Sequence, residues 1–154
     1  MKKIISGGQT GADRAALDAA IERGIPHGGW LPKGRATEDG PLGQQYRLQE
    51  LDSYRYRDRT EKNVVESDGT LIVSYGPLAS GSALTEALAI RYDRPCLHLN
   101  MDYFPLDDAV AAVEQWLAKN TINTLNVAGP RASSDEQIYE TVRKLILGIN
   151  TGDR

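Results

Sequence analysis

The sequence predicts a single α/β domain in which helices cover both faces of a doubly wound parallel sheet, giving three layers. Short apolar and β-branched runs alternate along the chain with longer segments whose apolar residues repeat at helical spacing. The run 69–74 is the clearest strand, and its near-continuous apolar character is typical of a parallel strand buried on both faces. A length of 154 residues suits one core. We assign residues 1–150 to the domain and residues 151–154 to a polar tail that we expect to fray.

The first elements are expected to be a strand over 3–6 and a helix over 13–23. Gly24 suits the left-handed position that ends such a helix, and Pro26 bars its continuation. The inward face of the helix carries two i, i+4 apolar pairs, Ala16 with Ala20 and Leu17 with Ile21.

A short second strand is expected over 27–30, although its glycines weaken the pattern. The section 31–55 reads as irregular, and a connection of that length in a compact domain is often functional. A helix over 57–68, with Val64 and Val65 facing inward, then leads into the strand at 69–74.

The second half continues the alternation of helix and strand. Pro105 fits the first position of a helix, and Ser133 with Glu136 forms a capping box before the last helix, which Gly148 closes. The expected elements are a helix over 84–92, a strand over 96–99, a helix with an inward stripe of Val110, Val113 and Leu117, a strand over 124–128, and a helix with Ile138, Val142, Leu145 and Ile146 in the core.

Composition excludes several classes of protein. The net charge of −3 argues against a dedicated nucleic-acid binder. The N-terminus turns polar at Ser6, and no run approaches the roughly 20 apolar residues of a membrane helix, so we expect a cytoplasmic protein without membrane contact. The single cysteine, Cys96, cannot form an internal disulfide and is expected to be inert packing, as is His98. We expect no catalytic nucleophile and no protein-bound metal.

The stretch from Ser6 to Arg14 joins the first strand to the first helix. Gly7, Gly8 and Gly11 allow a ligand to come close to the backbone, and the helix start suits a phosphate. The spacing matches neither the dinucleotide fingerprint nor a Walker A loop. Thr10 and Asp13 could equally form a capping box, which would need no ligand.

Ligands of doubly wound sheets bind at the carboxyl ends of the strands, and this rule gathers the turns 7–11, 31–43, 80–82 and 129–131 at one edge. Basic residues in or beside these turns predict an anion subsite, because arginine forks match phosphate. They are Arg14, Lys33, Arg35, Arg59 and Arg131. The carboxylate of Asp39 could read an amino-pyrimidine edge, or could only cap the turn before Gly40.

At this point the chain resembles the molybdenum cofactor carrier proteins. The resemblance covers most of the sequence, in these blocks: Ser6–Asp18, Trp30–Arg35, Asp39-Gly40, Tyr56, Arg59-Thr60, Asn63, Ser67–Leu71, Gly81–Thr85 and Asn126–Arg131. The family is Rossmann-like and stands near the lysine-decarboxylase-like superfamily that includes the cytokinin-activating phosphoribohydrolases. The resemblance implies a homo-oligomer that binds molybdenum cofactor without turnover, with molybdoenzymes as recipients.

That ligand is a pterin with a phosphate and a dithiolene that already holds the metal, so the implied site is a phosphate cradle and a pterin slot. For the phosphate, the resemblance points to Gly7, Gly8, Gln9, Thr10, Gly11 and Arg14 together with Gly81 and Ser82. For the pterin, it points to Arg35, Asp39 and Arg131.

Two other functions stay open at the level of sequence. Related phosphoribohydrolases carry a P-G-G-x-G-T-x-x-E loop, whereas the segment from Pro77 to Glu86 here has lost the double glycine. A non-catalytic sensor of a nucleotide derivative would need the same phosphate-binding turns. The sequence therefore favours a binding protein over an enzyme, with Glu86 as the residue on which an enzyme would depend.

Overall fold

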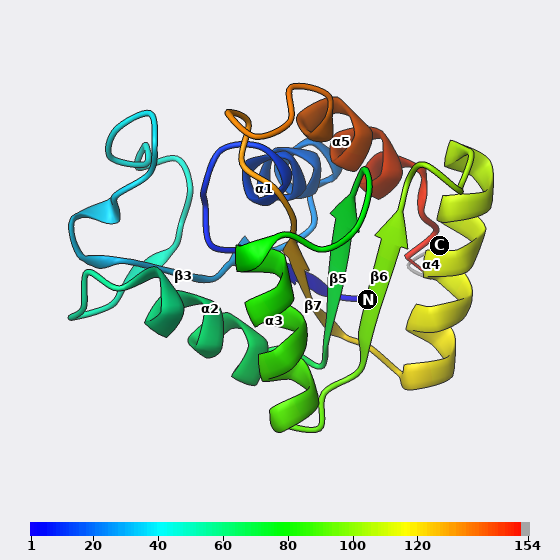
Figure 1. Cartoon of the computed structure of the whole chain (residues 1–154), viewed down its shortest axis with the longest axis horizontal. Helices are drawn as coiled ribbons and strands as arrows, with labels where there is room; N and C mark the ends of the chain where they lie inside the picture. The colour runs from blue at the N-terminus through cyan, green and yellow to red at the C-terminus, as the bar shows by residue number, and fades with distance from the viewer. Residues whose placement is uncertain (152–154) are drawn as a thin grey trace.

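The computed structural model describes residues 1–151 and confirms a single α/β domain with a five-stranded parallel sheet (Figure 1). The strands lie in the order β2-β1-β7-β5-β6. Their bounds are β1 Lys3–Ile5, β2 His27–Gly28, β5 Gly69–Ser74, β6 Cys96–Asn100 and β7 Thr124–Ala128. Strands β1, β5, β6 and β7 were thus expected from the apolar runs of the sequence, and β2 falls within the short strand expected over 27–30.

The last strand along the chain lies in the middle of the sheet. In β7, Leu125 pairs with Ile4 of β1 on one side and with Gly69 of β5 on the other. The strands can be renumbered as if the two chain ends were joined, so that β5, β6, β7, β1 and β2 become strands 1 to 5. The sheet then has the 2-1-3-4-5 order of flavodoxin-like sheets. The chain ends adjoin, since the Met1 ammonium donates to the Thr151 carbonyl at 3.4 Å. The topology is therefore that of a circularly permuted doubly wound sheet.

Helices cover both faces of this sheet, as the alternation of elements predicts. Helices α1 (Ala12–Arg23), α4 (Leu106–Asn120) and α5 (Ile138–Gly148) share one large apolar core with the sheet. Helices α2 (Tyr56–Val65) and α3 (Ser80–Arg91) lie side by side over the other face (Figure 1). Among the described residues, no helix is both long and apolar enough to cross a bilayer.

The expected strand over 27–30 is split at Gly29, which corrects the sequence prediction. Gly29 has φ +126°, and a Cβ there would overlap the Ser6 carbonyl, so the chain leaves the main sheet at this residue. Trp30–Leu31 (β3) then pairs with Gln49–Glu50 (β4) in a separate two-stranded sheet.

The segment between β3 and β4, which was expected to be irregular, includes a short 3₁₀ helix, η1, at Lys33–Arg35. Its fold is anchored on α1 by a buried apolar cluster of Leu17, Leu31, Leu42 and Leu48.

Both expected capping boxes are absent from the helix starts. The N-cap of α1 is Gly11, and the Asp13 carboxylate accepts from the amide of Gln9 instead of that of Thr10. Helix α5 begins only at Ile138, and the Ser133 hydroxyl donates to Glu38. In both cases a residue distant in the sequence takes the hydroxyl that local spacing had assigned to a cap.

Several side chains differ from their expected burial. Ile21 is 44% exposed, because α1 turns that position away from the core, and Val65 is half-buried while Val64 is fully buried. Cys96 is half-buried beside α2 and α3, and burial raises the pKa of its thiol to about 11, which keeps it protonated at neutral pH. His98 is also only half-buried, with its Nε2 2.7 Å from the Ser74 hydroxyl.

The end of the chain was expected to fray beyond the domain. The structure describes only Thr151 of this tail, and its carbonyl accepts from the Met1 ammonium at 3.4 Å. Residues 152–154 of the predicted tail lie outside the described residues.

Candidate ligand-binding site

A cleft of about 270 Å³ opens at the carboxyl ends of β1, β5 and β7. It lies where the strand order reverses, between β5 and β7, which is the place where doubly wound sheets bind ligands. Its walls come from the first turn and helix (Gly7, Gln9, Asp13), from α2 (Tyr56, Arg57, Arg59, Thr60, Asn63), from the start of α3 (79–82, 84, 85) and from the exit of β7 (126–131, 134). Segments far apart in the sequence therefore meet in one cavity.

The N-terminus of α3 is the most open backbone in this cleft. The amides of Ser80, Gly81 and Ser82 have no acceptor among the described residues, because the first turn of a helix lacks internal partners for them. A Cβ on Gly81 would meet nothing within 4 Å, and the first turn of α3 carries no acid. Three unpaired donors and the positive end of the helix dipole thus face a space that an anion could fill.

A buried ion pair lies against the opposite wall of the cleft. Arg59 Nη1 lies 2.8 Å from Asp13 Oδ2, and the two side chains are 14% and 7% exposed. Burial raises the pKa of Asp13, and the Arg59 guanidinium opposes this shift. The Arg59 side chain crosses directly over Gly7, whose absent Cβ would overlap the guanidinium. Gly7 therefore makes room for a side chain of the protein itself.

Two further arginines line the cleft with weaker ties to the protein. Arg131 reaches Glu38 only at 3.9 Å, and its guanidinium lies 5.8 Å from the ring centre of Tyr56. The same ring has Arg59 at 5.5 Å, so Tyr56 contacts both guanidinium groups. Arg57 is exposed and has no acid partner among residues 1–151. With Asp13 as the single acid in the lining, the cleft is strongly basic.

Two buried polar atoms near the cleft also lack a hydrogen-bond partner within residues 1–151, and both are donors. Gln9 Nε2 and Arg59 Nε are buried and have no acceptor among the described residues. The side-chain amide of Gln9 cannot be flipped, because its Oε1 already accepts from the backbone amides of Thr10 and Glu38. Both orphan atoms are donors, so this corner of the molecule lacks acceptors.

The glycine-rich turn after β1 is mostly closed to a ligand. The amides of Gly8, Gln9 and Thr10 donate to side chains nearby, and the amide of Ala12 donates to the Pro130 carbonyl at 3.1 Å. A Cβ on Gly11 would lie 2.5 Å from that same carbonyl. A Cβ on Gly8 would meet Leu42 at 2.8 Å. These glycines permit the close crossing of protein segments at the helix start.

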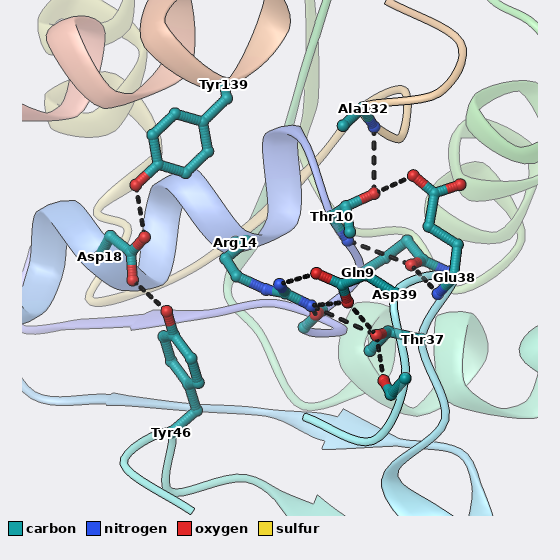
Figure 2. A network of polar contacts seen from close by, with 12 residues as sticks. Gln9, Thr10, Arg14, Asp18, Thr37, Glu38, Asp39, Tyr46, Ala132 and Tyr139 are labelled. Atoms are coloured by element: carbon teal, nitrogen blue, oxygen red, sulfur yellow. Dashed lines mark hydrogen bonds and ion pairs between the residues drawn. The ribbon is translucent and has the colours of Figure 1, made fainter. Parts of the chain in front are cut away.

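Residues 36–43 form a strap over this turn, tied to it by side chains (Figure 2). Thr10 donates to Glu38, whose other oxygen accepts from the Ser133 hydroxyl at 2.6 Å. Arg14 holds Asp39 at 2.8 and 3.1 Å, and this contact lowers the pKa of that carboxyl to about 2. Figure 2 shows the contacts of Thr10 with Glu38 and of Arg14 with Asp39 beside a second cluster, in which Asp18 accepts from the hydroxyls of two tyrosines.

Arg35 stabilises the far side of the strap. Its guanidinium donates to the carbonyls of Leu42, Leu48, Gly43 and Tyr46 at 2.8–3.2 Å. Arg35 itself has φ +57°, an uncommon backbone conformation for a residue with a side chain. These contacts explain Arg35 without a ligand.

The structure thus divides the residues that the sequence proposed for the site. Gly7, Gln9, Gly81, Ser82 and Arg131 line the cleft. Gly8, Thr10, Gly11, Arg14, Arg35 and Asp39 are not in its lining and have partners or close neighbours in the protein. The site argument had not assigned Asp13, Tyr56, Thr60, Asn63 and Asn126, although all of them belong to the sequence blocks that carry the family resemblance. Those blocks were the signal that could have found them.

The fold and the cleft define a doubly wound α/β protein, circularly permuted, with a basic cavity at its switch point. The chain belongs to the circularly permuted YpsA SLOG family, whose sequence model matches residues 4–149. It is 51% identical to a putative molybdenum carrier protein from Syntrophus aciditrophicus SB, whose crystal structure superposes with a TM-score of 0.94 over 96% of this chain and 95% of that one. No curated protein matches. These findings confirm the resemblance to the molybdenum carrier family.

Proposed function

We propose that this protein binds a phosphate-bearing small molecule, with molybdenum cofactor as the first candidate, and stores or carries it without turnover. The observation that carries the proposal is the unpaired start of α3 facing a cleft that is lined by three arginines and one acid. The name of the 51%-identical relative supports molybdenum-related cargo.

In the proposed complex the phosphate lies at the start of α3. The amides of Ser80, Gly81 and Ser82 donate to its oxygens, at the positive end of the α3 dipole. The pterin would lie deeper, toward Asp13 and Asn126. Asp13 replaces Asp39 as the carboxylate proposed for an amino-pyrimidine edge, because Asp39 is outside the cleft, whereas Asp13 lines it and uses one oxygen, Oδ2, for both Arg59 and the Gln9 amide.

The metal would travel with its own ligands. Among residues 1–151, no three His, Cys, Asp or Glu side chains gather in a way that could hold a metal ion. The protein would therefore recognise the phosphate and the heterocycle of the cargo, through hydrogen bonds and charge. Molybdenum is cargo here, and no step is assigned to it.

The position of Glu86 supports binding over glycosidic cleavage. Glu86 is not in the cleft lining, and its charge acts on the thiol of Cys96, the first residue of β6. Asp13, the acid that does line the cleft, is held by Arg59. A phosphoribohydrolase of the related type would place the loop glutamate beside the scissile bond. We therefore propose no catalytic residue.

Gly81→Leu tests the phosphate cradle directly. A Cβ at this position meets no protein atom within 4 Å, so the fold should tolerate the change while the side chain obstructs the amides. Ala87→Leu is the matched control, since Ala87 is an exposed residue of the same helix outside the cleft. Binding of molybdenum cofactor, AMP and GMP would be measured by calorimetry and by thermal shift.

We expect at least one ligand to bind and Gly81→Leu to weaken its affinity about tenfold or more, equivalent to roughly 1.4 kcal/mol. Ala87→Leu should leave the affinity unchanged. Equal losses in both variants would place the phosphate elsewhere. Release of free base from AMP by the wild-type protein, abolished by Glu86→Gln, would overturn the proposal of a carrier without turnover.

A further inference from the structure

We infer that the cleft accepts a ligand with two linked anionic groups, such as a diphosphate ester, and that Arg57 and Arg131 hold the outer one. This inference deepens the proposed function and rests on it. The inner group would occupy the start of α3, as described above.

The charge balance of the cleft is the first argument. Of the three arginines in the lining, only Arg59 is neutralised within it, by Asp13 at 2.8 Å. Arg57 has no acid partner among the described residues and Arg131 has only Glu38, at 3.9 Å, so both add positive charge to that of the α3 dipole. A single phosphate at the helix start leaves this second pair of cations without a counter-charge.

The partner of Arg131 within the protein is already satisfied by others. The Glu38 carboxylate accepts from the Thr10 hydroxyl, from the Ser133 amide at 3.1 Å and from the Ser133 hydroxyl. These hydrogen bonds, that of Ser133 first, lower the pKa of Glu38 and keep it charged without Arg131. The contact of Arg131 with Glu38 at 3.9 Å is too long for a hydrogen bond. Arg131 can therefore turn to a ligand at little cost to the strap.

The ring of Tyr56 contacts two of the three arginines of the cleft, Arg59 and Arg131. Its ring has Arg59 and Arg131 at 5.5 and 5.8 Å, and Arg57 follows it directly in the chain at the start of α2. Side chains in contact with an aromatic ring lose less freedom on binding than side chains in open solvent. Of the two outer arginines, Arg131 is thus partly ordered before any ligand arrives, and Arg57 lies exposed beside it in the cleft lining.

The size of the cavity agrees with a ligand that extends to the mouth. Clefts for drug-sized ligands measure roughly 300–1,000 Å³. A cavity of about 270 Å³ encloses one part of such a molecule, and the remainder must lie at the mouth, where Arg57 and Arg131 are exposed.

The test compares one anionic group with two. Calorimetry at fixed ionic strength, without divalent metal, would measure inorganic phosphate against pyrophosphate, and AMP against ADP. The wild-type protein should bind the two-group probe of each pair at least tenfold more tightly. Arg57→Gln should reduce this ratio to about threefold or less, while the affinity for the one-group probe changes little.

Arg55→Gln is the matched control. Arg55 is exposed and lies two residues before Arg57 in the chain, but it is not in the cleft lining, and its loss changes the net charge by the same amount. It should leave the ratio unchanged. A ratio near one in the wild type, or equal effects of Arg55→Gln and Arg57→Gln, would overturn the inference while leaving the proposed function intact. Failure of all four probes and of molybdenum cofactor to bind would overturn both.

Discussion

Gly7 is predicted to be required only because Arg59 crosses it. The backbone of Gly7 does not have a positive φ, so alanine is allowed there by conformation. The three atoms nearest to a Cβ at this position all belong to Arg59, and the nearest of them would overlap it. Gly7→Ala should therefore push the guanidinium away from Asp13.

The magnitude follows from the burial of the pair. Removing one partner of a buried ion pair costs roughly 3–5 kcal/mol of the free energy of unfolding. We expect about 3 kcal/mol for Gly7→Ala, because the displaced Arg59 can reach water and Asp13, with its raised pKa, can take up a proton. Arg59→Ala should cost a similar amount. In the Arg59→Ala protein the overlap is gone, so adding Gly7→Ala should stabilise by about 0.4–1 kcal/mol through the unfolded chain.

The assay is urea unfolding of the wild type, the two single variants and the double variant at neutral pH. The signature is a reversal of sign: Gly7→Ala destabilises when Arg59 is present and stabilises when it is absent. Unchanged denaturant slopes would show that the folded and unfolded states are comparable between variants. If Gly7→Ala costs the same in both backgrounds, the backbone of the turn is the cause, and the assignment of Gly7 to Arg59 is wrong.

Two other predictions concern the strap at 36–43. Arg35→Gln removes donors to four carbonyls, and charged hydrogen bonds of this kind contribute roughly 1.5–3 kcal/mol. Cleavage by protease within residues 36–48 should therefore be about tenfold faster or more. Lys33→Gln, at an exposed neighbouring position, should leave the cleavage rate unchanged. Asp39 has its pKa lowered from 3.8 to about 2, so the stability that it contributes is complete above pH 4 and is lost as the pH falls toward 2. Acid unfolding should accordingly be less steep in that window for Asp39→Asn, and an unchanged profile would contradict the role of Arg14.

Four of the five strands of the main sheet could be predicted because each is a locally distinct apolar run, whereas β2 at His27–Gly28 has no such run and its bounds were wrong; Gly24 has the left-handed conformation expected of it. The carboxyl-end rule also placed Gly7 and Gly81 correctly on one cavity. Predictions from local sequence spacing were wrong where a residue distant in the chain bonds the same polar group or fills the same space. The Thr10 hydroxyl goes to Glu38 instead of to a cap, and the glycine turn is filled by Leu42 and Pro130.

The same cause hid part of the site. Asp13 and Arg59 form a pair only because the chain brings α2 over the first turn; the sequence marked Asp13 as a possible cap and Arg59 as part of an anion subsite, but not the two as partners. Arg14 and Arg35 have the residue type of an anion site and Asp39 that of a pterin contact, but the structure shows Asp39 within the strap and both arginines bonded to it. Residue type and loop position could therefore predict where the cleft is, but they could not predict which charges are already neutralised.

The central place of β7 has a consequence for synthesis of the chain. Because β7 joins β1 to β5, the sheet consists of two separate halves until residues 124–128 have left the ribosome. Until then β1 and β5 each present an open, apolar strand edge of the kind that pairs with other chains. A nascent chain that pauses before this point is accordingly the form of the protein that most needs a chaperone.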